Sequence, residues 1–113
     1  MAARNPLIAA PPYPVDGALK QLGANLRTAR IRRRLTIEEV SKKIGAGYRA
    51  VADAEKGKPS SGIAVYAALL WAFDLLGELE AVADPTRDAE GQALARSREP
   101  SRARHARAVD NDF

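Results

Sequence analysis

The sequence predicts an all-α fold, with five helices packed into one compact domain. Apolar residues recur at spacings of three and four along several segments, a pattern typical of helices that bury one face. No segment alternates apolar and polar residues over the length of a strand. At 113 residues the chain has room for one domain. We predict this domain at residues 16–85, between an extended arm at 1–15 and a weak helix with a basic flexible tail at 86–113.

The first 15 residues are predicted to be extended, because each proline removes a backbone donor and disfavours helix at the residue before it. The prolines of this arm are Pro6, Pro11, Pro12 and Pro14. Asp16 can then cap a first helix from Gly17 to about Arg33. The apolar face of this helix consists of Leu19, Leu22, Leu26 and Ala29.

The clearest helix start lies at Thr36. Glu39 follows three residues later, so the two can form a capping box in which each side chain satisfies the backbone N–H of the other. A second helix is predicted over 37–44, with an apolar stripe of Ile37, Val40 and Ile44.

Gly45, Ala46 and Gly47 form a three-residue break after this helix. We expect a positive φ at Gly45, where a side chain would also meet the next helix. A third helix is predicted from Tyr48 to about Lys56, with Ala50, Val51 and Ala54 facing inward and Gly57 as its stop. Two short helices joined in this way describe a helix-turn-helix unit, a pattern that many small bundles also contain.

A fourth helix is predicted after Ser61, and its apolar face consists of Ile63, Tyr66, Leu70 and Phe73. A fifth carries Leu75, Leu76, Leu79 and Val82 up to Asp84 and Pro85. Residues 89–95 are expected to form one weak helix. Residues 99–113 are expected to be flexible, since they are polar, charged and almost free of large apolar groups. Trp71 falls outside the apolar face of the fourth helix and is a candidate for a dimer or partner contact.

Composition argues against an enzyme or a metal site. The chain has no cysteine and one histidine, so thiolate or histidine metal cages are excluded and no cofactor is predicted. Neither a glycine-rich phosphate loop nor a paired-carboxylate site is found. The absence of cysteine is also consistent with a reducing compartment, and neither a signal peptide nor a membrane span is expected. The predicted location is therefore cytoplasmic and nucleoid-associated.

Charge is distributed in blocks. Residues 20–34 contain six basic and no acidic residues, whereas residues 74–90 contain six acidic residues and one arginine. Residues 96–107 contain five arginines and one glutamate. Such blocks are expected of a protein that lays one face on DNA. The arginines at 32–34 fit two interpretations equally, a solvated helix end that the helix dipole favours and a phosphate grip.

The segment from Leu22 to Ser60 resembles the XRE-type, phage-repressor-like family of helix-turn-helix domains. The residues that carry the resemblance are Arg30, Leu35-Thr36, Gly45 and Glu55-Lys56-Gly57. The continuation YAALLWAFDLLGELEAVADP and the arginine-containing tail resemble the HipB-type antitoxins of type II toxin–antitoxin systems. The resemblance implies that Arg30 and Glu55 form an ion pair inside the domain.

The same resemblance implies a homodimeric repressor that binds double-stranded DNA at a palindromic operator in its own promoter and also binds a HipA-like, kinase-fold toxin. The predicted DNA-binding residues are Arg34, Thr36, Ile37, Gly47, Tyr48, Arg49, Ala52, Asp53, Lys56, Lys58, Arg102 and Arg104. Tyr48 and Arg49 are the expected base readers, and Asp53 could accept from a cytosine amino group.

Three positions depart from the family pattern, in which Gln, Ser and often Arg or Lys stand where this chain has Ile37, Gly47 and Asp53. The predicted reading surface is therefore poor in donors, and specificity is expected to depend on dimerisation, DNA shape or the arms. Two alternatives stay open: a phage-like or metabolic regulator without a toxin partner, and a protein-interaction module that has lost DNA binding.

Overall fold

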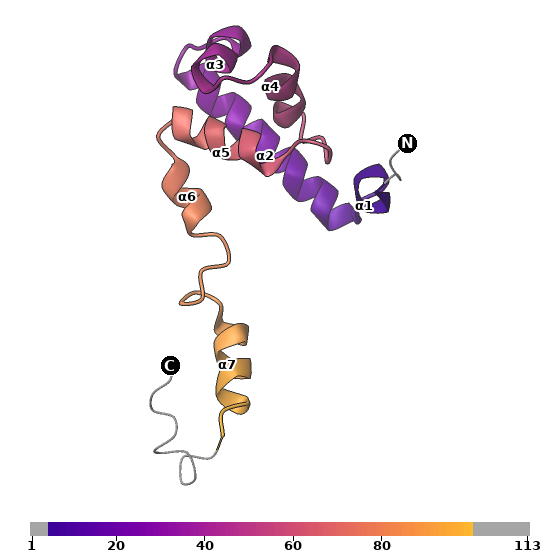
Figure 1. Cartoon of the computed structure of the whole chain (residues 1–113), viewed down its shortest axis with the longest axis vertical. Coiled ribbons are helices and arrows are strands. Elements are labelled where there is room, and N and C mark those ends of the chain that lie inside the picture. Colours follow the sequence, from indigo (N-terminus) through magenta and orange to yellow (C-terminus); the bar gives the residue numbers. More distant parts are fainter. Residues whose placement is uncertain (1–4, 101–113) are drawn as a thin grey trace. The chain divides into compact units, whose positions relative to one another are not determined.

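A computed structural model describes residues 5–100, and these residues form helices and no strands (Figure 1). The all-α prediction is confirmed. The described helices are α1 (Pro6–Ala9), α2 (Tyr13–Arg32), α3 (Ile37–Ile44), α4 (Tyr48–Glu55), α5 (Ile63–Ala72), α6 (Leu76–Glu80) and α7 (Ala89–Ser97). The count of five is wrong, because seven helices are present in this part of the chain. The five predicted for the domain correspond to α2–α6.

The prediction of an extended arm over residues 1–15 is wrong within the described part of that segment. Pro6–Ala9 form a helical turn, and α2 begins at Tyr13 rather than at Gly17. Proline is well suited to the first turn of a helix, where the N–H it lacks would have no partner. Pro6 is the first residue of α1, whose cap Asn5 accepts a hydrogen bond of 2.9 Å from the Leu7 N–H. Pro14 lies in the first turn of α2.

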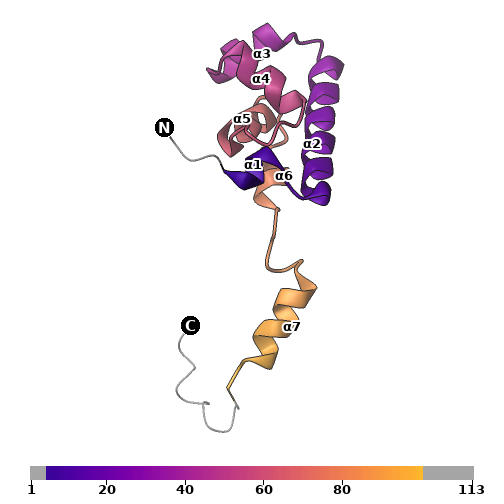
Figure 2. The ribbon, with the colours of Figure 1, turned by 90° about the vertical axis from the view of Figure 1, so that its right-hand side faces the viewer.

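The described residues divide into two compact units, 5–80 and 81–100. The core of the first unit comes from α2, α3, α4 and α5, and Figure 2 shows α2 along one side of the other three. The buried apolar residues are Leu26, Val40, Val51, Ala54, Tyr66, Leu69, Leu70 and Phe73. Ile63 was predicted to face inward but is 68% exposed, and Leu69 is buried instead. Because α5 is apolar on every side, its periodicity could not identify the inward face.

Helices α2 and α4 approach each other so closely that two glycines are required. A Cβ built on Gly23 of α2 would lie 2.5 Å from the Glu55 carbonyl oxygen and 2.6 Å from that of Ala54. Gly57 follows α4 with a φ of +71°, and a Cβ there would lie 2.6 Å from the Leu19 carbonyl oxygen. All three of these neighbours are backbone atoms, which cannot rotate away as a side chain can. The spacing of α2 and α4 therefore depends on both glycines.

The predicted capping box is present at the start of α3. The Thr36 hydroxyl accepts from the Glu39 N–H at 3.0 Å, and the Glu39 carboxylate accepts from the Thr36 N–H at 2.8 Å. Gly45 ends α3 with a φ of +75°, as expected for a left-handed cap. The expected clash at this position is wrong, because a Cβ on Gly45 would have no neighbour within 4 Å. Gly45 is needed for its backbone conformation alone.

The predicted fifth helix ends earlier than expected, since α6 stops at Glu80 and Val82 is 68% exposed. In the second unit, α7 confirms the helix predicted at 89–95 and extends it to Ser97. Asp88 caps α7 by accepting from the Gly91 N–H at 3.0 Å. Within residues 5–100, no helix is both long enough and apolar enough to cross a membrane.

Candidate nucleic-acid interface

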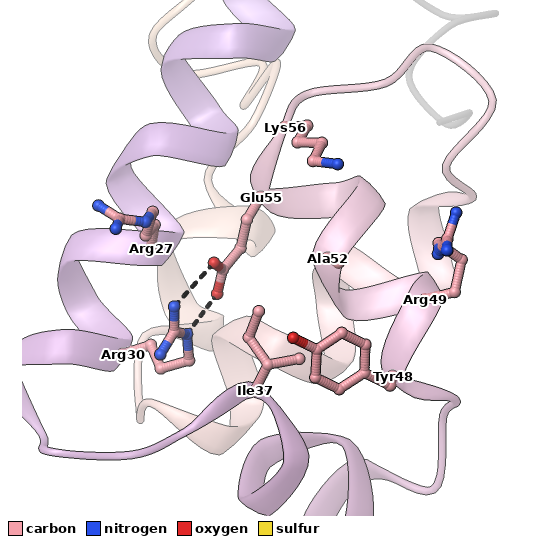
Figure 3. Close-up of a pocket in the computed structure, with 8 residues that line it drawn as sticks. All are labelled: Arg27, Arg30, Ile37, Tyr48, Arg49, Ala52, Glu55 and Lys56. Atoms are coloured by element: carbon pink, nitrogen blue, oxygen red, sulfur yellow. Dashed lines mark hydrogen bonds and ion pairs between the residues drawn. The ribbon is translucent and has the colours of Figure 1, made fainter.

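A groove of about 440 Å³ lies between α2 and α4 (Figure 3). Ile37, the first residue of α3, forms part of its wall. The residues that line the groove are Arg27, Arg30, Ile37, Tyr48, Arg49, Ala52, Glu55 and Lys56. Five of the predicted DNA-binding residues and both members of the predicted ion pair therefore meet in one place.

The Arg30–Glu55 ion pair joins α2 to the end of α4. Arg30 Nε donates to Glu55 Oε2 at 2.6 Å, and Arg30 Nη2 donates to Glu55 Oε1 at 3.0 Å. The third donor, Nη1, bonds the Leu35 carbonyl oxygen at 2.8 Å. The side chains are only 11% and 6% exposed. The hydrogen bonds that Arg30 donates to the Glu55 carboxylate raise the pKa of Arg30, against the opposing effect of burial, so the guanidinium stays charged at physiological pH.

Three further cations line the groove, namely Arg27 from α2 and Arg49 and Lys56 from α4 and its C-cap. Each is exposed, and none has a hydrogen-bond acceptor or acidic partner within residues 5–100. The carboxylate of Glu55 is neutralised by Arg30. The groove therefore carries a net positive charge that is available to an anionic partner.

Arg27 is a residue that the sequence interpretation missed. It lies three residues before Arg30 on α2, and residues at this spacing share one face of a helix. Because the sequence predicts that Arg30 faces the helix now labelled α4, the same spacing predicts that Arg27 faces α4 as well. Figure 3 places Arg27 and Arg49 on opposite sides of the groove.

The expected base readers lie at the start of α4. Gly47 is the N-cap, with a φ of −74° and no side-chain cap, so the first N–H groups of α4 have no side-chain acceptor. Tyr48 is 59% exposed, and Arg49 is the next residue of the helix. Ala52 follows one turn later and is half-buried. Among these residues of α4, Tyr48 and Arg49 carry side-chain donors and Ala52 carries none.

Other predicted residues lie away from the groove lining or are engaged elsewhere. Asp53 Oδ1 lies 3.4 Å from Lys58 Nζ, so the two form an ion pair, which would have to open before Asp53 could accept from a base. The Thr36 hydroxyl is used by the capping box. Arg34 follows α2 with a positive φ of 57° and is exposed. Arg102 and Arg104 lie outside the described residues.

Arg33 has a structural role that distinguishes it from its neighbours. Its guanidinium donates to the Ala29 carbonyl at 2.9 Å and to the Phe73 carbonyl at 3.0 Å. It also lies 5.5 Å from the centre of the buried Phe73 ring, within the range of a cation–π contact. Arg33 thus caps the ends of α2 and α5, which favours the helix-end interpretation at this position.

No protein-family model, curated protein or solved structure matches this chain. The resemblance to XRE-type domains therefore stays a prediction.

Proposed function

We propose that this protein is a sequence-specific, double-stranded DNA-binding repressor that places α4 in the major groove. The observation that carries the proposal is the arrangement around α4. This short helix, whose first two residues Tyr48 and Arg49 are exposed, follows a three-residue break after α3. Three cations that have no acidic partner within residues 5–100 line the groove beside it. A major groove admits one helix, and the phosphates on its two sides attract cations that flank that helix.

Each groove residue has a distinct role in this proposal. Arg49, at the second position of α4, reaches a base edge, where a bidentate contact to guanine is the commonest specific one. Tyr48 contacts a base or the sugar–phosphate backbone beside it. Arg27 and Lys56 contact phosphates, which fix the orientation of the domain without reading sequence. The Arg30–Glu55 pair holds α2 against α4, so that the distance between Arg27 on α2 and Arg49 on α4 stays fixed.

The regulatory role extends this proposal on the basis of the family resemblance. A homodimer would bind two half-sites of a palindromic operator in its own promoter. The HipB-like part of the resemblance supports an antitoxin that also binds a kinase-fold toxin. A regulator without a toxin partner is the alternative, and a kinase-like reading frame beside the gene would separate the two.

The second candidate function is a protein-interaction module without DNA binding. Ile37 and Ala52 in the groove lining favour it, because neither side chain can donate a hydrogen bond. Arg27 and Arg49 do not separate the two candidates, since arginine is also enriched in protein–protein interfaces, but Lys56 argues against this one, since lysine is depleted there.

Replacing Arg49 with alanine tests the assignment of α4 as the reading helix. We expect operator affinity to fall by about 1–3 kcal/mol and the preference for operator over random DNA to shrink, because a base contact is lost. The measurement is fluorescence anisotropy with operator and scrambled duplexes. Arg87→Ala is the matched control, because Arg87 is an exposed arginine outside the groove lining, in the acidic segment 74–90. An Arg49→Ala protein that discriminates as well as the wild type would show that α4 does not read the bases.

A further inference from the structure

The outward side of α5 is apolar along its whole length. Tyr66, Leu69 and Leu70 face the core, whereas Ile63, Ala64 and Trp71 are exposed. Ala67 and Ala68 lie between them and are half-buried. At about 3.6 residues per turn, the members of this second set share one side of the helix. We call them the outer face of α5: Ile63, Ala64, Ala67, Ala68 and Trp71.

This outer face is unusual for a surface helix. A helix that is apolar on every side is normally buried on every side. In residues 5–80, however, Ile63 stays 68% exposed and Trp71 57% exposed. The two residues lie on the same side of one helix, so they are not scattered single exposures. A contiguous exposed apolar face marks an interaction site.

We infer that a second copy of this chain covers the outer face of α5, with the two α5 helices antiparallel across a two-fold axis near Ala67. This arrangement rests on the proposed function, because a palindromic operator requires a two-fold dimer. The face is self-complementary in this direction, whereas a parallel pair would set the two Trp71 side chains against each other. Trp71 of one copy meets Ile63 and Ala64 of the other, so that a large side chain at one end packs against a smaller pair at the opposite end.

Charge at the two ends of α5 favours the same direction. Lys56 precedes the helix, beside Lys58, whose charge is balanced by its ion pair with Asp53, whereas Asp74, Glu78 and Glu80 follow the helix. An antiparallel pair brings the basic end of one copy near the acidic end of the other, whereas a parallel pair brings like charges together. Antiparallel helix dipoles add to this preference. At the Trp71 end of the face, Lys43 of α3 lies 5.9 Å from the centre of the Trp71 ring, within the range of a cation–π contact.

The size of the face determines the expected strength. Ten residues of helix extend for about 15 Å. A face of this length buries less than the roughly 800 Å² per partner of a standard interface, and small interfaces are weak. We therefore expect a dissociation constant that is roughly micromolar, so that the dimer is completed on an operator with two half-sites.

The first test is sedimentation equilibrium of the full chain without DNA, with Trp71 emission followed on dilution. Trp71 is the only tryptophan, so its emission reports directly on this face. We expect a monomer–dimer equilibrium and a shift of the emission to longer wavelength as the dimer dissociates. Ile63→Lys should weaken the dimer at least about tenfold, because it places a charge in an apolar contact. Ile31→Lys is the matched control, because Ile31 is an exposed isoleucine on α2, and it should leave dimerisation unchanged.

The second test fixes the direction, since the chain has no cysteine of its own. Ala67→Cys should form a disulfide-linked dimer on mild oxidation, because residues at a two-fold axis meet their own copies. Ile63→Cys alone should not, whereas the double variant Ile63→Cys/Trp71→Cys should. Melting temperatures measured on every variant show whether each stays folded.

Three results would overturn the inference: a chain that stays monomeric at its highest soluble concentration, an Ile63→Lys protein that dimerises like the wild type, and a cross-link at position 63 in place of position 67. None of these experiments contains DNA. A negative result in these experiments would therefore count against the dimer alone. A failure of the proposed DNA binding would leave the dimer intact.

Discussion

Replacing Glu55 with alanine is expected to lower the free energy of unfolding by about 3 kcal/mol, the low end of the roughly 3–5 kcal/mol lost when a buried ion pair is broken. The Arg30 guanidinium would lose two of its three hydrogen bonds while staying charged and only 11% exposed. Removing one partner is more harmful than removing both, because the remaining charge is left without compensation. Chemical denaturation followed by circular dichroism measures the change.

Two companion variants separate the ion pair from general effects. Glu55→Gln keeps the size of the side chain and one acceptor oxygen, so it should destabilise less than Glu55→Ala. Glu78→Ala removes an exposed glutamate that has no ion pair within residues 5–100 and should change stability by less than about 0.5 kcal/mol. If Glu55→Ala unfolds at the same denaturant concentration as Glu78→Ala, the Arg30–Glu55 pair does not stabilise the domain.

Gly23→Ala is expected to destabilise the domain by about 2 kcal/mol, although alanine normally stabilises the interior of a helix relative to glycine by about 0.5–1 kcal/mol. The reversed sign follows from the close approach of α4. The added Cβ would lie 2.5 Å from the Glu55 carbonyl oxygen, so α2 and α4 would have to separate. That separation would also lengthen the hydrogen bonds between Arg30 and Glu55.

Gly17→Ala is the matched control for this prediction. Gly17 belongs to the same helix, and a Cβ built on it has no neighbour within 4 Å. It should therefore show the ordinary gain of about 0.5–1 kcal/mol. Thermal and chemical unfolding of both variants measure the difference. Two stability changes of the same sign would contradict the described spacing of α2 and α4.

The features that the sequence predicted well depend on local chemistry. Thr36 and Glu39 lie within one turn of each other, so their capping box needs no information from the rest of the fold. The positive φ of Gly45 likewise follows from the residues on either side of it. The weak helix predicted at 89–95 is present as α7, which starts at the local cap Asp88, a signal that the prediction did not use.

The features that it missed depend on tertiary contacts or on uniform composition. Gly23 is an ordinary mid-helix glycine until the carbonyl groups of α4 are placed beside it. The inward face of α5 could not be chosen, because every side of that helix is apolar. Arg27 could have been found from its spacing of three from Arg30, but its place opposite Arg49 depends on the crossing of α2 and α4. The pairing of Asp53 with Lys58 depends on the turn after α4, which no local motif specified.

The salt dependence of binding to DNA from upstream of the protein's own coding sequence tests the central claim most directly. We expect the logarithm of affinity to fall linearly with the logarithm of salt concentration, with a slope of about −0.9 for each phosphate contact. Arg27→Gln should make the slope shallower by about 0.9 per bound protomer, and the control Arg87→Gln should leave it unchanged. Fluorescence anisotropy over a salt series supplies all three slopes. No detectable binding, or equal slopes for the wild type and Arg27→Gln, would contradict the assignment of this groove to DNA.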